Sequence, residues 1–169
     1  MTLTGDPNQA DLYRELLAST DPERRRMGVE GLARISDPAM LPGFKKDFQR
    51  EGNPDVQLAY NFAIALLGDR AFLDSIILSL SASGSRGERA SGYLIELGPS
   101  ITVDLYPYLG DQDAGVRAAL ADVLAELGDP DAVEWLTPLL NDPNSGVADS
   151  ANRAIQRLRR VGPASSLDP

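Results

Sequence analysis

The stretch VRAALADVLAELGD, from Val116 to Asp129, places apolar residues at helical spacing and ends in Leu-Gly-Asp. The segment from Val56 to Asp69 (VQLAYNFAIALLGD) has the same spacing and ending, and the apolar pattern returns between residues 147 and 158. Apolar side chains three and four residues apart lie on one face of a helix. A period of about 31 residues is typical of stacked helical hairpins, so the sequence predicts an all-α fold, an α-solenoid.

Five such hairpins fit the chain. The last apolar residue of each second helix recurs at spacings of 32, 30, 30 and 31, at Ile35, Leu67, Leu97, Leu127 and Leu158. First helices are predicted near 8–18, 38–49, 70–80, 100–109 and 130–140, and second helices near 22–35, 54–67, 87–97, 114–127 and 144–159. Residues 1–160 then form a single domain with repeats at 8–36, 37–68, 69–98, 99–128 and 129–159. Residues 161–169 have the composition of a disordered tail.

Capping residues agree with this register. An Asp or Asn followed by Pro favours a helix start, and these pairs are Asp21-Pro22, Asp37-Pro38, Asn53-Pro54, Asp129-Pro130 and Asp142-Pro143. Glycines that follow second helices suit the left-handed residue at a helix end, and these are Gly68, Gly98 and Gly128. In the fourth repeat the shared helical face predicts burial of Val116, Leu120, Leu124 and Leu127.

Several of these residues carry a resemblance to a known family. Asp113, Val116-Arg117, Leu127-Gly128-Asp129, and Pro138 with Pro107 one period earlier resemble HEAT repeats. The short period is similar to the bacterial HEAT-like type that also occurs in phycobilisome lyases. The resemblance covers residues 21–158 and is most specific between 100 and 158. It implies partner binding or scaffolding as a class tendency.

Composition excludes several kinds of site. The chain has no Cys and no His, which removes thiolate metal sites, cysteine nucleophiles and the commonest general base, so neither a metal site nor a cofactor is expected. The net charge of −9 disfavours a nucleic-acid partner. The first residues show no signal peptide and no apolar run is long enough for a membrane, so a cytoplasmic protein is expected. Arginine supplies 14 of the 16 basic residues, which favours a bacterial source.

Acidic residues gather in the second half of the chain. Residues 104–152 contain ten acids and one basic residue, Arg117. Five aspartates fall at predicted turns: Asp111, Asp113, Asp129, Asp131 and Asp142. They could bind Ca²⁺ or a basic partner, but none follows an EF-hand spacing, and capping of helices explains most of them.

The third repeat departs from the pattern. Arg86 and Arg89 take positions of the apolar stripe, among Gly84, Gly87 and Gly92. Buried unpaired guanidinium groups are costly and glycine weakens a helix, so a shortened, mobile helix is favoured over an anion-binding notch.

A binding groove is predicted on the concave face. The second helix of the second repeat is apolar on all sides, which leaves Leu58, Phe62 and Ala65 off the core stripe. The equivalent positions of the next helix are Glu88, Gly92 and Ile95. A large aromatic beside a glycine gap is typical of a binding groove. The N-terminal segment or a second copy of the chain are the alternative covers for Phe62. The predicted binding residues are Gln57, Leu58, Asn61, Phe62, Arg89, Gly92, Ile95 and Arg117.

The function predicted from the sequence is a scaffold or adaptor that binds a protein or peptide on this face, and not an enzyme. A bilin-lyase-like subunit and a structural module of a longer protein are the alternatives. Deoxyhypusine hydroxylases resemble this fold, but they bind iron through His-Glu pairs, and this chain has no His.

Overall fold

The computed structural model describes residues 9–35 and 38–161. Within these ranges every regular element is a helix, so the protein is all-α and belongs to the α-solenoid class of helical hairpins. The predicted tail and the cap at Asp37 lie outside the described residues, except for Val161 at the end of the last helix. The chain divides into two compact units, unit 1 (Met1–Ile76) and unit 2 (Ile77–Pro169).

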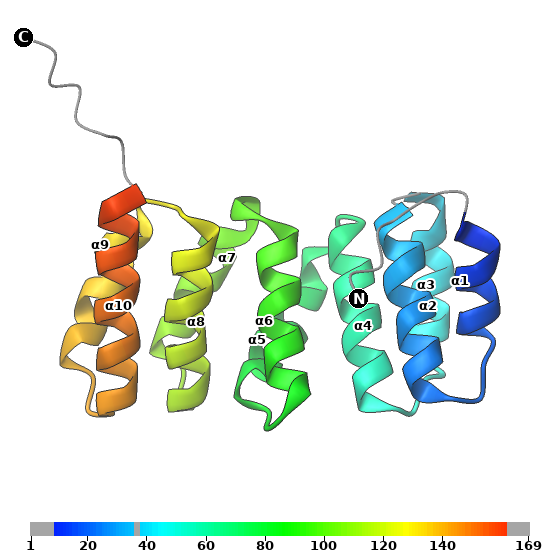
Figure 1. Ribbon diagram of the computed structural model, residues 1–169, viewed down its shortest axis with the longest axis horizontal. Coiled ribbons are helices and arrows are strands. Elements are labelled where there is room, and N and C mark those ends of the chain that lie inside the picture. Colours follow the sequence, from blue (N-terminus) through cyan, green and yellow to red (C-terminus); the bar gives the residue numbers. More distant parts are fainter. Residues whose placement is uncertain (1–8, 36–37, 162–169) are drawn as a thin grey trace, which may run out of the picture. The chain divides into compact units, whose positions relative to one another are not determined.

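Unit 1 holds two complete helical hairpins. They are formed by α1 (Ala10–Leu17) with α2 (Pro22–Ile35), and by η2 (Pro38–Met40) and α3 (Leu41–Phe48) with α4 (Pro54–Leu66). The helix α2 packs against both α1 and α4, and α3 packs against α4 (Figure 1). A short segment, η3 (Arg70–Phe72), follows α4, and α5 (Leu73–Leu78) crosses the boundary between the units.

Unit 2 repeats this arrangement with three second helices. These are α6 (Ser85–Leu97), α8 (Ala114–Leu127) and α10 (Ser145–Val161), which lie side by side in Figure 1. The first helices are short and end in 3₁₀ turns: η4 (Ser79–Ser81) precedes α6, η5 (Pro99–Ile101), α7 (Thr102–Leu105) and η6 (Tyr106–Gly110) precede α8, and α9 (Ala132–Leu136) with η7 (Thr137–Asn141) precedes α10.

Prolines explain why two of the first helices are divided. Pro107 and Pro138 are the second residues of η6 and η7. Proline has no backbone N–H and its ring crowds the preceding turn, so the α-helix cannot continue through it and tightens into a 3₁₀ segment. The sequence predicts continuous helices over 100–109 and 130–140, and the structure corrects this detail.

The core of α8 follows the predicted stripe with one exception. Val116, Leu120 and Leu124 are at most 1% exposed. Leu127 is only half-buried because it is the last residue of the helix, before Gly128 turns the chain with φ +73°.

Capping side chains hold the helix starts. Asn53 Oδ1 accepts hydrogen bonds from the backbone N–H groups of Asp55 and Val56, and Asp113 Oδ1 accepts one from Gly115. The cap of α10 is Asn144 and not the predicted Asp142, whose carboxylate has another partner described below.

The helix α6 is longer than predicted. It begins at Ser85, not near residue 87, so the shortened helix expected from its arginines and glycines is wrong. Gly87 is the reason: a Cβ there would lie 2.5 Å from the Ala82 carbonyl oxygen and 2.8 Å from that of Leu80. Glycine lets the first turn of α6 approach the end of η4 closely.

Candidate protein-binding surface

The predicted aromatic of the groove is part of the core. Phe62 is 0% exposed and Leu58 is 2% exposed, so the sequence-based placement of both on an open groove is wrong. A helix that is apolar on all sides is normally buried on all sides, and α4 is contacted by both α2 and α3. The guanidinium of Arg34, from α2, lies 5.5 Å from the centre of the Phe62 ring.

The predicted polar contacts around Phe62 are also engaged or buried. Gln57 Nε2 donates a hydrogen bond of 2.6 Å to the Glu51 carbonyl oxygen. Asn61 is 6% exposed, and its Oδ1 has no hydrogen-bond partner within the described residues. In the described part of unit 1, the predicted groove residues of α4 are therefore buried or hydrogen-bonded within the fold.

Arg117 is likewise structural, because it links two successive repeats. Its Nε and Nη2 donate hydrogen bonds of 2.8 Å to both oxygens of Asp142, and its Nη1 donates one of 2.7 Å to the Asp111 carbonyl oxygen. Both side chains are largely buried. Bidentate Arg–carboxylate pairs combine strength with fixed geometry, so Arg117 is not available at a groove rim.

Unit 1 contains the same link. Arg25 donates hydrogen bonds of 2.9 and 3.0 Å to the carboxylate of Glu51, and its Nη1 donates to the carbonyl oxygens of Ser19 and Thr20. In both links the carboxylate also accepts a backbone N–H two residues later, from Asn53 or Asn144. We call Arg25–Glu51 and Arg117–Asp142 the repeat links.

The repeat links change the acidity of their carboxyl groups. The hydrogen bonds from Arg25 lower the pKa of Glu51, and those from Arg117 lower the pKa of Asp142. In the unfolded chain these groups return to their ordinary values of 4.5 and 3.8. The stabilisation is therefore complete above those values and is lost as the pH falls through the lower pKa values of the folded protein.

We expect acid to destabilise the protein partly through the repeat links. The unfolding temperature of the wild type should fall on acidification below about pH 4. A double variant, Arg25→Met with Arg117→Met, should be less stable at pH 7 and should show a smaller decrease between pH 6 and pH 2. The unfolding temperatures of both proteins would be measured across this pH range. If they fall in parallel, the links contribute nothing to the sensitivity to acid.

The remaining predicted residues lie on α6. Gly92 is exposed, and a Cβ there would meet nothing within 4 Å. Ile95 is 37% exposed, whereas Arg89 is half-buried. Gly92 and Ile95 thus lie on the surface that α6 shares with α8 and α10, which we call the second-helix face of unit 2.

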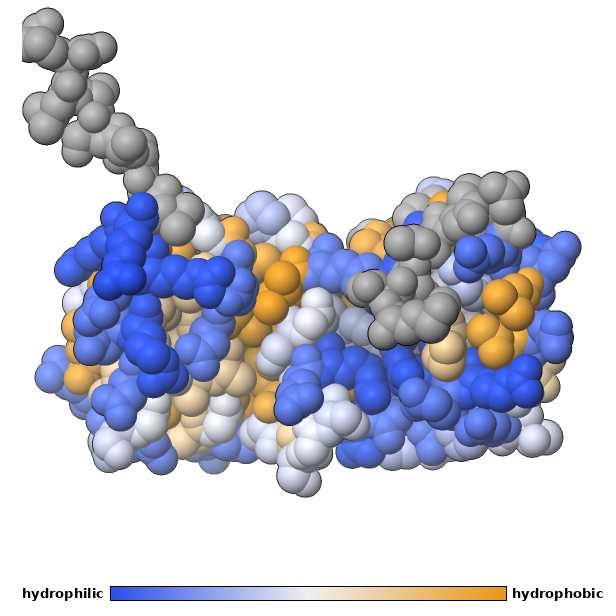
Figure 2. Space-filling model, viewed as in Figure 1, coloured by the Kyte–Doolittle hydropathy of each residue, from blue (hydrophilic) through white to orange (hydrophobic). Residues whose placement is uncertain are grey.

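The second-helix face contains a cleft between α8 and α10. Its volume is about 260 Å³, and it is lined by Asp122, Ala125 and Glu126 from α8 and by Arg153, Ala154 and Arg157 from α10. Figure 2 shows hydrophilic surface over α10 and a weakly hydrophobic band from α8 toward α6. The cleft combines small apolar residues with charged residues from both helices.

Two ion pairs join the helices across this cleft. Arg153 Nη2 lies 3.7 Å from Asp122 Oδ1 and also donates a hydrogen bond of 2.8 Å to the hydroxyl of Ser150. The Arg157 guanidinium forms two hydrogen bonds with the Glu126 carboxylate. In both pairs the partners are 31 residues apart, which is one period of the repeat. This spacing of opposite charges is present in the sequence, but the sequence-based prediction did not use it.

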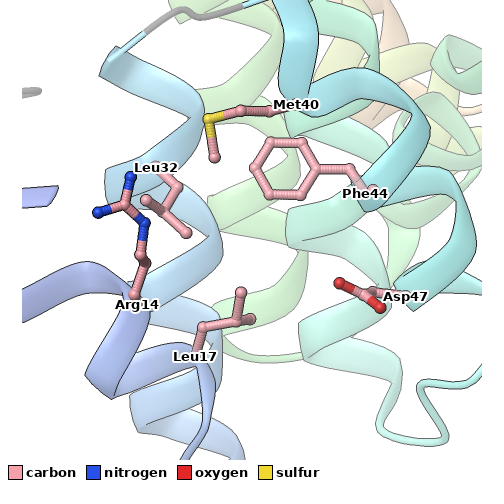
Figure 3. Close-up of a pocket in the computed structure, with 7 residues that line it drawn as sticks. Arg14, Leu17, Leu32, Met40, Phe44 and Asp47 are labelled. Carbon is pink, nitrogen blue, oxygen red and sulfur yellow. The ribbon is translucent and has the colours of Figure 1, made fainter. Parts of the chain in front are cut away.

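A second cavity lies in unit 1, among α1, α2 and α3. Its volume is about 270 Å³. Leu17, Leu32, Met40 and Phe44 form apolar walls, and Arg14 and Asp47 lie at opposite sides (Figure 3). Both volumes lie just below the range of about 300–1,000 Å³ that is usual for small-molecule sites.

Among the five predicted turn aspartates, Asp113 caps a helix, whereas Asp131 makes no side-chain cap hydrogen bond and Asp142 pairs with Arg117, so the expectation that capping explains most of them is wrong. Besides Asp113, the carboxylates of Asp111 and Asp129 accept backbone N–H groups two residues later. Among residues 9–35 and 38–161 there is no group of three or more Asp or Glu side chains that could hold a metal ion. Over the same ranges, no helix has the length and apolar character that crossing a membrane requires.

The helices, their period and the links between them define a helical-repeat protein, and the family comparison agrees. Residues 102–169 match the model of HEAT repeats. This match supports a HEAT-like repeat protein. No curated protein matches it in a sequence search.

Two solved structures show likeness over most of the chain. A crystal structure of an engineered protein is 20% identical, covers 92% of this chain and 81% of that chain, and has a TM-score of 0.43. Human deoxyhypusine hydroxylase in complex with glycerol is 15% identical, covers 92% of this chain and 75% of that chain, and has a TM-score of 0.36. With both TM-scores below 0.5, neither likeness bears on function.

Proposed function

We propose that the protein is a scaffold whose second-helix face of unit 2 binds a segment of a partner protein. HEAT repeats are commonly protein-interaction scaffolds. The observation that carries the proposal is the cleft between α8 and α10, which is lined by two alanines and by two ion pairs that join the helices.

The chemistry of the face suits a peptide with both apolar and charged side chains. One apolar side chain of a partner could enter the cleft beside Ala125 and Ala154, where burial contributes about 1.5–3 kcal/mol. The exposed ion pairs Asp122–Arg153 and Glu126–Arg157 are individually worth little to stability, so their charges can be shared with a ligand.

The same register position differs between the three second helices of this face. Gly92, Asp122 and Arg153 each lie five residues before the anchors Leu97, Leu127 and Leu158. The glycine leaves space on α6 next to the charged pair on α8 and α10. The absence of a side chain at Gly92 therefore leaves space on this face for a partner segment.

A substitution at Gly92 tests the proposal without disturbing the fold. Peptides would be selected from a random display library on the wild-type protein, and their affinities then compared with those for Gly92→Arg. We expect the affinity to fall tenfold or more, which is about 1.4 kcal/mol, because the new side chain would fill the space that Gly92 leaves on the face.

The matched control is Gly110→Arg at the end of η6, where a Cβ would also meet nothing within 4 Å. This variant should bind the selected peptides as the wild type does. If Gly92→Arg keeps full affinity, or if both variants lose it equally, the second-helix face of unit 2 is not the binding surface.

A further inference from the structure

A half-exposed tryptophan lies on the other side of unit 2, on the first helices. Trp135 of α9 stacks on Tyr106 of η6, with ring centres 4.5 Å apart and planes 13° from parallel. Trp135 is 51% exposed, whereas Tyr106 is 8% exposed. Because Tyr106 covers one face of the indole, the opposite face is the one open to solvent. Half-exposed aromatic side chains of this kind are typical anchors for binding partners.

Acidic residues lie close to this aromatic pair in space or in sequence. The Tyr106 hydroxyl donates a hydrogen bond of 3.4 Å to Asp129 Oδ2. Asp131 precedes Trp135 by four residues at the start of α9, and Glu134 is its direct neighbour; both are exposed. Burial, Asp129 and Asp131 together raise the pKa of Tyr106 to about 12, so the hydroxyl stays protonated and Asp129 stays its acceptor.

The first helices of unit 2 supply no cation of their own. Between residues 99 and 141 the only basic residue is Arg117, and both oxygens of Asp142 engage it. In the described part of the chain, Lys and Arg side chains lie over the rings of Phe62 and Phe72, and none is found over Trp135. The open indole face and the adjacent negative charges are therefore complementary to a cation that must come from outside unit 2's first helices.

We propose that Trp135, supported by Tyr106, binds an arginine or lysine side chain in a basic segment of a partner protein, with Asp131 and Glu134 as its counter-charges. A cation over an aromatic face is attracted to the ring, most strongly for tryptophan, and arginine can stack and donate to a carboxylate at once. This site is separate from the second-helix face of unit 2, so its test is independent of the proposed function.

The intrinsic fluorescence of the protein reports directly on this site, because Trp135 is the only tryptophan in the chain. The full chain would be titrated with an acetylated Gly-Arg repeat peptide and with a matched peptide in which citrulline replaces arginine. The arginine peptide should change the emission of Trp135 saturably, with an affinity that falls as salt increases, because exposed charges are screened. The uncharged citrulline peptide should produce no saturable change.

Two variants of equal charge locate the binding. Asp131→Asn should weaken binding of the arginine peptide about two- to fivefold, the range expected for an exposed ion pair. Asp149→Asn, on the exposed surface of α10, removes the same charge elsewhere and should leave the affinity unchanged.

The proposal would be overturned by no saturable response to the arginine peptide, by an equal response to the citrulline peptide, or by an equal loss in the two variants. A blue shift of Trp135 emission with increasing protein concentration alone, accompanied by dimers in sedimentation, would also overturn it. That outcome would show that a second copy of the chain covers the indole.

Discussion

Replacing Phe62 with Ala should lower the free energy of unfolding by about 3–5 kcal/mol. The side chain is 0% exposed, and its removal leaves a cavity that the neighbouring helices can only partly fill. Urea or thermal unfolding of the variant would measure the loss. The expected shift is large because a whole domain is stabilised by only about 5–15 kcal/mol.

A control separates burial from the mere loss of an apolar group. Leu12→Ala, in the same unit, removes a side chain that is 48% exposed and should change stability by less than about 0.5 kcal/mol. If Phe62→Ala is as mild as Leu12→Ala, Phe62 lies at an open surface, and the description of α4 as core is wrong.

Two glycines of α6 should respond to alanine in opposite directions. Gly87→Ala should destabilise the protein by about 1–3 kcal/mol, because the new Cβ would meet the carbonyl oxygens of Ala82 and Leu80 at 2.5 and 2.8 Å. Gly92→Ala adds a Cβ in open space and should stabilise the helix by about 0.5–1 kcal/mol.

Both glycine variants would be measured by urea unfolding under the same conditions. The pair is internally controlled, since both positions lie in one helix and differ in what surrounds them. If both substitutions stabilise the protein, α6 does not approach η4 as closely as described above.

The register of the repeats could be predicted because it depends on local signals. The apolar spacing, the helix caps and the glycines after second helices each act within a few residues, and they placed α2, α4 and α8 within one residue at each end. The division of the first helices by Pro107 and Pro138 was also readable from local chemistry, but the sequence-based expectation treated both prolines as tolerated.

The burial of α4 could not be predicted in the same way. A helix that is apolar on all sides does not show which side is covered, because burial depends on helices distant in the sequence. Phe62 was therefore assigned to an open groove, whereas α2 brings Arg34 over its ring. The start of α6 was misjudged for a similar reason, since the role of Gly87 depends on contacts with η4.

The candidate site was predicted in part. The exposure of Gly92 and Ile95 follows from the register, and the structure places both on the surface. Arg117 was assigned to a groove rim because its partner, Asp142, lies 25 residues later and was interpreted as a cap. The cleft between α8 and α10 depends on charge pairs one period apart, which periodicity of apolar residues does not reveal.

Chemical-shift mapping of a bound peptide tests the central claim most directly. A display-selected peptide would be added to the isotopically labelled full chain, and the shifts of backbone amides followed during titration. We expect the largest shifts on α6, α8 and α10, around Gly92, Ala125 and Arg153. Shifts confined to the cavity among α1, α2 and α3, or to the first helices of unit 2, would contradict a binding surface on the second helices.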